Sequence, residues 1–249
     1  MERVHRRVIS ALMFSFLVSI QAGAQQPLPT RITLGVAPIL SQPKEEFSRN
    51  VGNGFGVDGA FLYHLDRSGI LSLRFDASGS SYGRETKRVP FSATVGGRIL
   101  VDATTTNSMM AFGFGPELAF PRGPVRPYVN AGLSGLLFRT SSSVKGLQTS
   151  EDGNVSTTNH SDGTRAWVFG SGVRIPLPAR ASSFSLDLGL RYHRGGPASY
   201  LREGSIQDRP DGSIDIAPLN SRTPYMAYLI GIRFRIPYNS SGPCPRFLC

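Results

Sequence analysis

Residues 224–238 (PYMAYLIGIRFRIPY) constrain the fold of this chain more than any other segment, because their polarity alternates along the whole stretch. The even-numbered positions are apolar: Met226, Tyr228, Ile230, Ile232, Phe234, Ile236 and Tyr238. Among the odd-numbered positions from 227 to 235, Ala227, Gly231, Arg233 and Arg235 are small or charged, and Leu229 is the one large exception. Side chains of a strand point alternately to opposite faces, whereas a helix would spread this pattern over all sides. The segment therefore predicts a β-strand with one apolar and one charged face.

Such a strand fits two kinds of protein. In a soluble sheet protein, the apolar face would cover a core and the charged face would meet water. In a transmembrane barrel, the apolar face would meet lipid, and Arg233 and Arg235 would point into the lumen. The rest of the chain has to separate these two possibilities.

Seven further segments show the same alternation, which gives eight predicted strands, an even number. They are residues 31–40, 55–65, 70–80, 110–120, 127–137, 165–175 and 184–193. Residues 93–106 also have partial strand character. We interpret them as part of a strand pair that rises beyond the membrane into an ordered external loop. The alternative, a ninth and a tenth strand, would place the long loops on mixed sides of the sheet.

The connections between these segments alternate in length. The short ones are residues 66–69, 121–126 and 176–183, and the long, polar ones are residues 41–54, 81–108, 140–164 and 195–223. A barrel with short periplasmic turns and longer external loops shows this alternation in loop length, whereas nothing in the architecture of a soluble sandwich requires it. A three-residue turn ending at Gly69 would keep the faces of its two strands aligned and place Gly where a positive φ is commonly needed. The sequence thus predicts an all-β fold, an eight-stranded antiparallel up-and-down transmembrane β-barrel.

The ends of the chain indicate export. Residues 1–24 combine a basic start, an apolar run and a small-residue cleavage site, which is typical of a secretory signal peptide rather than of an uncleaved anchor. We expect residues 25–249 to form a single outer-membrane β-barrel domain with a short C-terminal periplasmic tail. Cys244 and Cys249 lie in that tail, where they could form a structural disulfide or remain two thiols.

Composition and charge exclude several other classes of protein. A hydrophobic content of 40% does not suit a disordered chain, and no segment after the signal has the roughly 20 uninterrupted apolar residues of a spanning helix. The formal net charge is +10, but the basic residues are dispersed, so we expect no nucleic-acid binding. Four scattered His residues offer no metal-ligand spacing, and we expect no metal and no cofactor.

Charged residues on the predicted inner faces have mixed signs. They are Asp58, Arg74, Asp76, Glu117, Arg174, Asp187, Arg191, Arg233 and Arg235. An eight-stranded barrel is just wide enough for side chains to fill, so these residues should pair with one another rather than line a channel. Arg174 and Asp187 should face each other across the turn at residues 176–183, and Arg233 should join them through Asp187. An ion or proton pathway is the alternative role for this set.

Catalytic patterns are weak in this sequence. His160, Ser161 and Asp162 are adjacent in a predicted loop, where neighbouring positions cannot hold the geometry that nucleophilic catalysis requires. His193 could approach a loop serine such as Ser199, but the strand pattern points it inward. We therefore expect no enzymatic activity.

The order Gly231-x-x-Phe234-x-Ile236 resembles the C-terminal strand motif of bacterial outer-membrane barrels. With the signal pattern, the eight strands and the loop rhythm, the chain resembles the small outer-membrane β-barrel family, of the OmpA transmembrane domain, OmpX and OmpW type. This resemblance implies an outer-membrane location, contact with outer-membrane lipid and lipopolysaccharide, and insertion by the barrel-assembly machinery. The family hosts many functions, so its fold does not supply one.

Three functions are therefore compared. We expect a structural or surface-interaction barrel that acts through its external loops, whose partner the sequence does not specify. Passage of small or hydrophobic solutes is the first alternative, because glycines on the inner faces leave some room: Gly113, Gly115, Gly132, Gly170, Gly172 and Gly189. A lipid-modifying enzyme is the second alternative, and it would need a Ser–His pair at the membrane rim.

Overall fold

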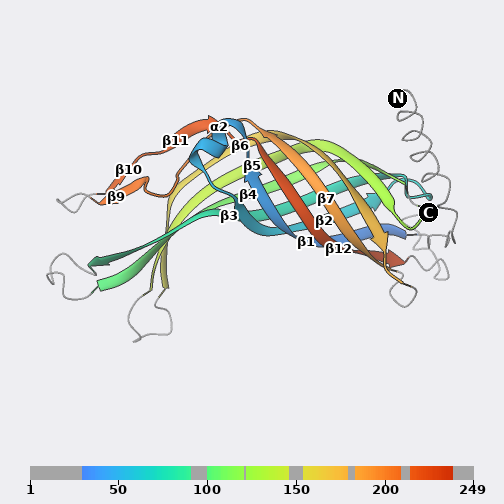
Figure 1. Cartoon of the computed structure of the whole chain (residues 1–249), viewed down its shortest axis with the longest axis horizontal. Coiled ribbons are helices and arrows are strands. Elements are labelled where there is room, and N and C mark those ends of the chain that lie inside the picture. Colours follow the sequence, from blue (N-terminus) through green and yellow to red (C-terminus); the bar gives the residue numbers. More distant parts are fainter. Residues whose placement is uncertain are drawn as a thin grey trace, which may run out of the picture.

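Eight strands close into an antiparallel barrel in the computed structural model, which describes residues 30–90, 100–120, 122–145, 154–178, 183–208 and 214–237 (Figure 1). The barrel strands are β1 (Thr30–Pro43), β2 (Gly54–His64), β3 (Leu71–Pro90), β4 (Leu100–Ala119), β5 (Arg126–Lys145), β6 (Asn154–Pro176), β7 (Phe184–Gly195) and β12 (Tyr225–Pro237). Each pairs with its neighbours in chain order, and β12 closes the barrel against β1. The predicted fold class is confirmed. The expected signal peptide and the two cysteines lie outside the described residues.

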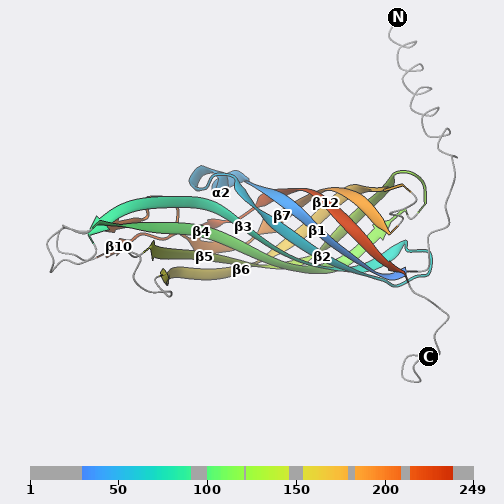
Figure 2. The same cartoon turned by 90° about the horizontal axis from the view of Figure 1, so that it is seen from below.

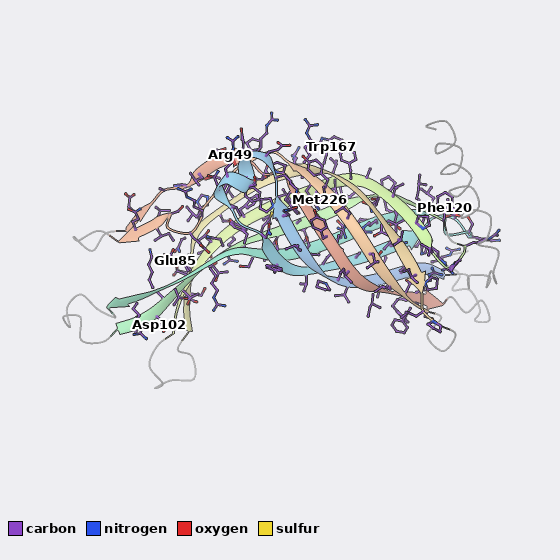
Figure 3. The ribbon with its side chains drawn as sticks, viewed as in Figure 1. Arg49, Glu85, Asp102, Phe120, Trp167 and Met226 are labelled. Carbon is purple, nitrogen blue, oxygen red and sulfur yellow. The ribbon has the colours of Figure 1, made fainter. Side chains whose placement is uncertain are left out.

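Apolar side chains cover the outside of the barrel, and charged side chains fill its inside. On β12, Ile230 is 62% exposed, whereas Arg233 is only 2% exposed. We call the outward-facing apolar side chains the apolar belt; it includes Val36, Phe61, Phe75, Phe112, Phe114, Val129, Leu133, Trp167, Phe169, Leu190, Ile230 and Ile232. Trp167 and Phe120 project from this outer surface (Figure 3). A soluble domain has the opposite distribution, so the outer wall suits a lipid environment.

The turn between β2 and β3 has the predicted register. Phe61 lies opposite Phe75, and Gly69 has a φ of 72°, so both strands keep their apolar faces outward. The carboxylate of Asp66 accepts hydrogen bonds from the Ser68 hydroxyl and from the backbone N–H groups of Ile70 (3.1 Å) and Leu71 (2.7 Å). Slight burial raises the pKa of Asp66, but these hydrogen bonds outweigh it and lower the pKa to about 2.

Four strands continue beyond the barrel at the end opposite this turn (Figures 1 and 2). Pairing of β2 with β3 ends at Ser81, and pairing of β7 with β6 ends at Ala166, but β3 to β6 remain paired further out. We call this protruding sheet the extension. The predicted strand pair is confirmed as far as it is described, since residues 100–106 of β4 pair with residues 84–90 of β3. The loop predicted at residues 140–164 is wrong in part, because β5 runs to Lys145 and β6 begins at Asn154.

Two long connections fold against the extension instead of forming plain loops. The link between β1 and β2 contains α2 (Glu45–Asn50). The link between β7 and β12 contains β8 (Pro197–Tyr200), β9 (Ile206–Asp208), β10 (Ile214–Ile216) and β11 (Leu219–Arg222), which form two small two-stranded sheets, β8 with β11 and β9 with β10. Lys87 Nζ donates to the Ile206 carbonyl over 3.0 Å, so the second link is fastened to β3. No helix in the described part of the chain is long and apolar enough to cross a membrane.

An aromatic cap closes the barrel below the extension. It consists of Phe47 from α2, Tyr82 from β3, Phe138 from β5 and Tyr200 from β8. The ring of Phe47 lies 5.0 Å from that of Tyr200 and 5.8 Å from that of Phe138, in edge-to-face contacts. Phe47, Phe138 and Tyr200 are almost completely buried. The only helix described in the chain is thus held by one buried aromatic side chain.

Candidate functional site

A continuous chain of ion pairs crosses the barrel interior. It alternates carboxylates and guanidinium groups in the order Asp58, Arg191, Asp76, Arg74, Glu117, Arg174, Asp187 and Arg233. These side chains come from β2, β3, β4, β6, β7 and β12, so the chain links six of the eight barrel strands. We call this set the lumen network. All of the residues predicted from the sequence belong to it except Arg235.

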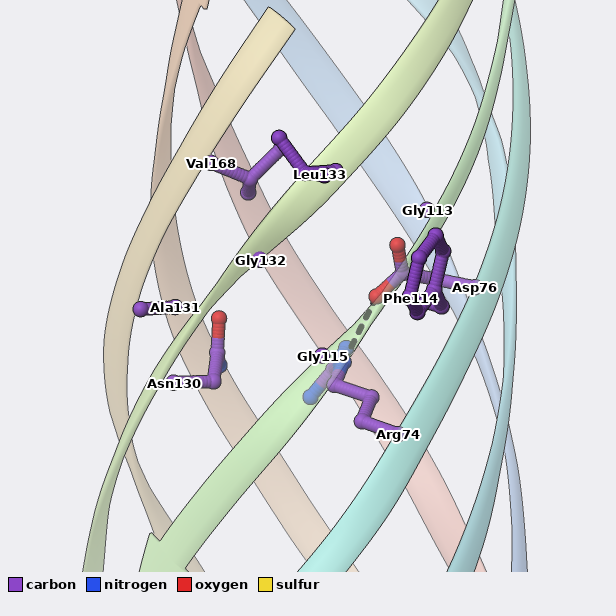
Figure 4. Close-up of a pocket in the computed structure, with 10 residues that line it drawn as sticks. All are labelled: Arg74, Asp76, Gly113, Phe114, Gly115, Asn130, Ala131, Gly132, Leu133 and Val168. Atoms are coloured by element: carbon purple, nitrogen blue, oxygen red, sulfur yellow. Dashed lines mark hydrogen bonds and ion pairs between the residues drawn. The ribbon is translucent and has the colours of Figure 1, made fainter.

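Glu117 lies at the centre of the lumen network and is completely buried. Its two carboxylate oxygens accept hydrogen bonds from Arg74 Nη1 over 3.0 Å and from Arg174 Nη2 over 2.6 Å. Arg74 also donates from Nε to Asp76 over 2.7 Å, the contact drawn in Figure 4. Glu117 therefore joins the two halves of the network through charge-assisted hydrogen bonds.

The two outer parts of the network differ in their geometry. Arg191 bridges Asp58 (2.8 Å) and Asp76 (3.0 Å) with its two terminal nitrogens. On the other side, Arg233 Nε lies 2.6 Å from Asp187. Asp187 thus has two arginine neighbours, Arg233 and the more distant Arg174.

The structure places Arg174 opposite Asp187 in the strand register, as the turn length suggested. Their nearest charged atoms are 3.9 Å apart, however, and the shorter contact of Arg174 is the one to Glu117. Arg174 also stacks on the Tyr128 ring, with 4.2 Å between the guanidinium carbon and the ring centroid. Arg235 is half-buried and forms no ion pair with any residue that the structure describes.

The inner glycines create space that other side chains occupy. A Cβ added at Gly113 would overlap the Asp76 carboxylate, and one added at Gly172 or Gly189 would overlap the Tyr128 hydroxyl. The cavity beside Arg74 and Gly115 has a volume of only about 10 Å³ (Figure 4). This is about the minimum volume that one water molecule needs. Gly113, Gly172 and Gly189 therefore make room for large polar side chains rather than for a solute.

The histidines of the described region have structural partners. His64 lies between Thr33 (2.9 Å) and the Ser72 hydroxyl (2.7 Å). His193 is buried and stacks on Tyr225, with 4.3 Å between the ring centroids. No group of three or more potential metal ligands occurs within the described ranges.

His160 and Asp162 both contact the backbone of Ser199. His160 Nε2 lies 3.1 Å from the Ser199 carbonyl oxygen, and Asp162 accepts a 2.6 Å hydrogen bond from the Ser199 N–H. That hydrogen bond, together with a second one from the Gly163 N–H, lowers the pKa of Asp162. The two side chains thus fasten β8 to β6. The motif of His160, Ser161 and Asp162, which superficially resembles a catalytic set, therefore has a structural role.

Comparison with known proteins gives matches at the level of structure. The chain is similar to the crystal structure of the outer membrane protein OprG from Pseudomonas aeruginosa, with a TM-score of 0.52, 9% identity and coverage of 87% of this chain and 100% of that chain. Our chain has the fold of an outer-membrane β-barrel. It also matches Neisserial surface protein A (TM-score 0.46, 15% identity, 86% and 99% coverage). A third match is the outer membrane protease OmpT from Escherichia coli, with a TM-score of 0.37, 10% identity and coverage of 87% of this chain and 99% of that chain.

Sequence comparisons add nothing to this result, since neither a scan of protein-family models nor a search of curated proteins gives a match. At such low identity, the similarity to OprG supports the fold alone. Any function has to be argued from the side chains of this chain.

Proposed function

We propose that this protein is an integral, non-enzymatic protein of the bacterial outer membrane, with a closed lumen and a structured surface beyond the barrel. The observation that carries the proposal is the lumen network, which fills the interior inside an apolar outer wall. Buried ion pairs lose much of their solvation but can fix one arrangement of the strands that carry them, and this is the role that we propose for the lumen network.

The extension supplies the proposed contact surface. Its strands carry hydroxyl side chains that bond across the sheet, such as Thr86 with Thr104 (3.1 Å) and Thr105 with Ser142 (2.8 Å). Backbone N–H groups of Arg84 and Gly204 donate to Glu203 and Glu85, which fixes the covering segment against β3. A polar surface held in one conformation suits contact with a macromolecule.

The two alternative functions have less support. Passage of solutes needs space, but the cavity within the lumen network is too small for one. Enzymatic activity needs a nucleophile beside an accessible base, but His160 contacts the Ser199 carbonyl and His193 is buried against Tyr225. The fold itself does not decide this point, because a protease is among the similar structures.

The same proposal covers the export of the protein and its insertion into the outer membrane. We propose that residues 1–24 are a cleaved signal peptide and that residues 25–249 form one barrel domain. The motif with Gly231, Phe234 and Ile236 lies on β12, the last barrel strand, where the barrel-assembly machinery would recognise it. Outer-membrane lipid and lipopolysaccharide would then surround the apolar belt.

The membrane assignment predicts heat-dependent mobility on gels. The mature protein should fractionate with the outer membrane and should migrate faster in unboiled than in boiled SDS samples, because a closed barrel has no free sheet edge at which unfolding can begin. Recovery from the soluble periplasm with no change on heating would contradict the proposal.

The closed lumen predicts that the protein does not conduct ions. Purified protein in planar lipid bilayers should give no stable open channel, because the lumen network and the aromatic cap block the path one above the other. A matched measurement on Phe47→Ala, which opens only the cap, should remain silent. Steady conductance of the intact protein would replace our proposal with a transport function.

A further inference from the structure

A groove of about 800 Å³ lies on the outer wall of the barrel where the apolar belt ends. It is lined by side chains from β5, β6, β7 and β11, among them Leu133, Arg165, Trp167, Tyr192, Arg194 and Arg222. On β6 the outward residue that follows Trp167 toward the extension is Arg165, and on β7 the one that follows Tyr192 is Arg194. The groove therefore has an apolar lower part and a cationic upper part.

Backbone contacts fix the three segments that carry the arginines. The Gly196 N–H donates to the Arg165 carbonyl over 2.9 Å, and the Thr223 N–H donates to the Gly196 carbonyl over 3.2 Å. A Cβ at Gly195 would overlap Thr223, so glycine permits this close approach. The groove is thus a built part of the fold.

The arginines of the groove have no acidic partner. Arg165, Arg194 and Arg222 are exposed, and none of them forms an ion pair with another residue in the described part of the chain. Arg194 lies directly opposite Trp167 across the β6–β7 pair, so Arg165 is its diagonal neighbour on the same face. The backbone positions of diagonal neighbours lie about 7–8 Å apart, so their long side chains can bring two like charges close enough to repel each other. An anion between them would remove the repulsion.

One carboxylate also lines the groove. Glu45 accepts a long hydrogen bond of 3.4 Å from the Tyr192 hydroxyl. The three arginines and this one glutamate give the lining residues an excess of two positive charges, so the groove still favours an anionic ligand. Glu45 has a positive φ of 51°, and it lies at the start of α2, on the rim of the groove.

We propose that this groove binds the phosphorylated headgroup of an outer-leaflet lipid, with the arginines on the phosphates and the acyl chains along Leu133 and Trp167. Arginine binds phosphate through two parallel N–H donors. Tryptophan and tyrosine are typical of the membrane interface, and Trp167 and Tyr192 lie on their strands between other residues of the apolar belt and the arginines. The inference rests on the proposed membrane location of the barrel.

The lipid is favoured over a soluble anion or a protein partner by the position of the groove. The cationic part is continuous with the apolar belt through Trp167 and Leu133, which are 58% and 41% exposed. A soluble anion would leave this apolar part uncovered. A lipid covers both parts with one molecule and adds the hydrophobic free energy of its chains.

Native mass spectrometry of the detergent-solubilised full chain tests the site. The probes are lipid A with two phosphates, the same lipid A without phosphates, and inorganic phosphate as a competitor. We expect the wild-type barrel to retain one bisphosphorylated lipid and to bind the dephosphorylated lipid at least about tenfold more weakly. The combined variant Arg165→Gln, Arg194→Gln and Arg222→Gln should bind the bisphosphorylated lipid at least about tenfold more weakly than wild type.

A matched control removes three other arginines of the extension and its cover. The combined variant Arg84→Gln, Arg88→Gln and Arg202→Gln changes the net charge equally but leaves the groove intact, so it should bind like wild type. Equal binding by the groove variant, equal binding of the dephosphorylated lipid, or displacement by inorganic phosphate would each overturn the lipid site. The unboiled gel mobility of both variants tests the membrane barrel separately.

Discussion

Replacing Glu117 by alanine is expected to lower the free energy of unfolding of the barrel by about 3–5 kcal/mol, the usual cost of removing one partner from a buried ion pair. Glu117 is completely buried and accepts hydrogen bonds from both Arg74 and Arg174. Its loss leaves two guanidinium groups in the lumen with one carboxylate fewer between them. Arg74 would keep Asp76, but Arg174 would keep only the distant contact to Asp187.

Urea unfolding from lipid vesicles measures this change. Trp167 is the sole tryptophan of the chain and lies on the apolar belt, so its fluorescence reports the transfer from lipid to water. The matched control is Asp102→Ala, because Asp102 pairs with Arg88 on the exposed extension over 3.3 Å. An exposed pair contributes about 0–1 kcal/mol. Equal midpoints for the Glu117 and Asp102 variants would show that the lumen network does not stabilise the barrel.

The barrel itself could be predicted from the sequence because lipid and lumen impose opposite demands on alternate residues. Wherever a strand has Ile or Phe outside and Arg or Asp inside, as at Ile232 and Arg233, the pattern is visible in one sequence. The register across short turns also follows, since the Pro176–Ser183 link has a defined centre. Arg174 and Asp187 lie opposite each other for that reason.

Most of the extension could not be predicted in the same way, and the exception is the β3–β4 pair, which the partial strand character of residues 93–106 indicated. Beyond the membrane neither face of the sheet meets lipid, so the apolar alternation that marks a strand disappears. Residues 140–143 (TSSS) are strand residues of β5, yet their side chains make polar contacts, such as Thr140 with Asn107 over 2.7 Å. Runs of Ser and Thr were interpreted as loop, although threonine is also common in strands.

The inner network was predicted as a set, but of its contacts only those of Asp187 with Arg174 and Arg233 were predicted. Face assignment identified which residues point inward, but the pairing depends on strand tilt and side-chain length. Glu117 contacts Arg174 from a strand two positions away in the barrel, a contact that no turn register contains. The groove escaped prediction because Arg165, Arg194 and Arg222 are far apart in the sequence, and Arg222 lies on a strand that was expected to be loop.

Placing arginine on the lipid-facing wall should block insertion. Ile230 lies near the middle of the outward series on β12, between Tyr228 and Ile232, and is 62% exposed on the apolar belt. We expect Ile230→Arg to cost about 2–4 kcal/mol, the range for an arginine at the midplane of a transmembrane barrel. Leu188→Arg, opposite Ile230 on β7, should behave alike, because the two positions form one cross-strand pair.

Insertion into preformed vesicles, followed by the unboiled gel shift, measures the folded fraction of each variant. Gln207→Arg adds the same charge at an exposed position on β9, away from the barrel wall, and should insert like wild type. The contrast separates an effect of lipid contact from an effect of added charge. If Ile230→Arg inserted as well as Gln207→Arg, the outer wall at β12 would not meet lipid, and the assignment of inside and outside would have to be reversed.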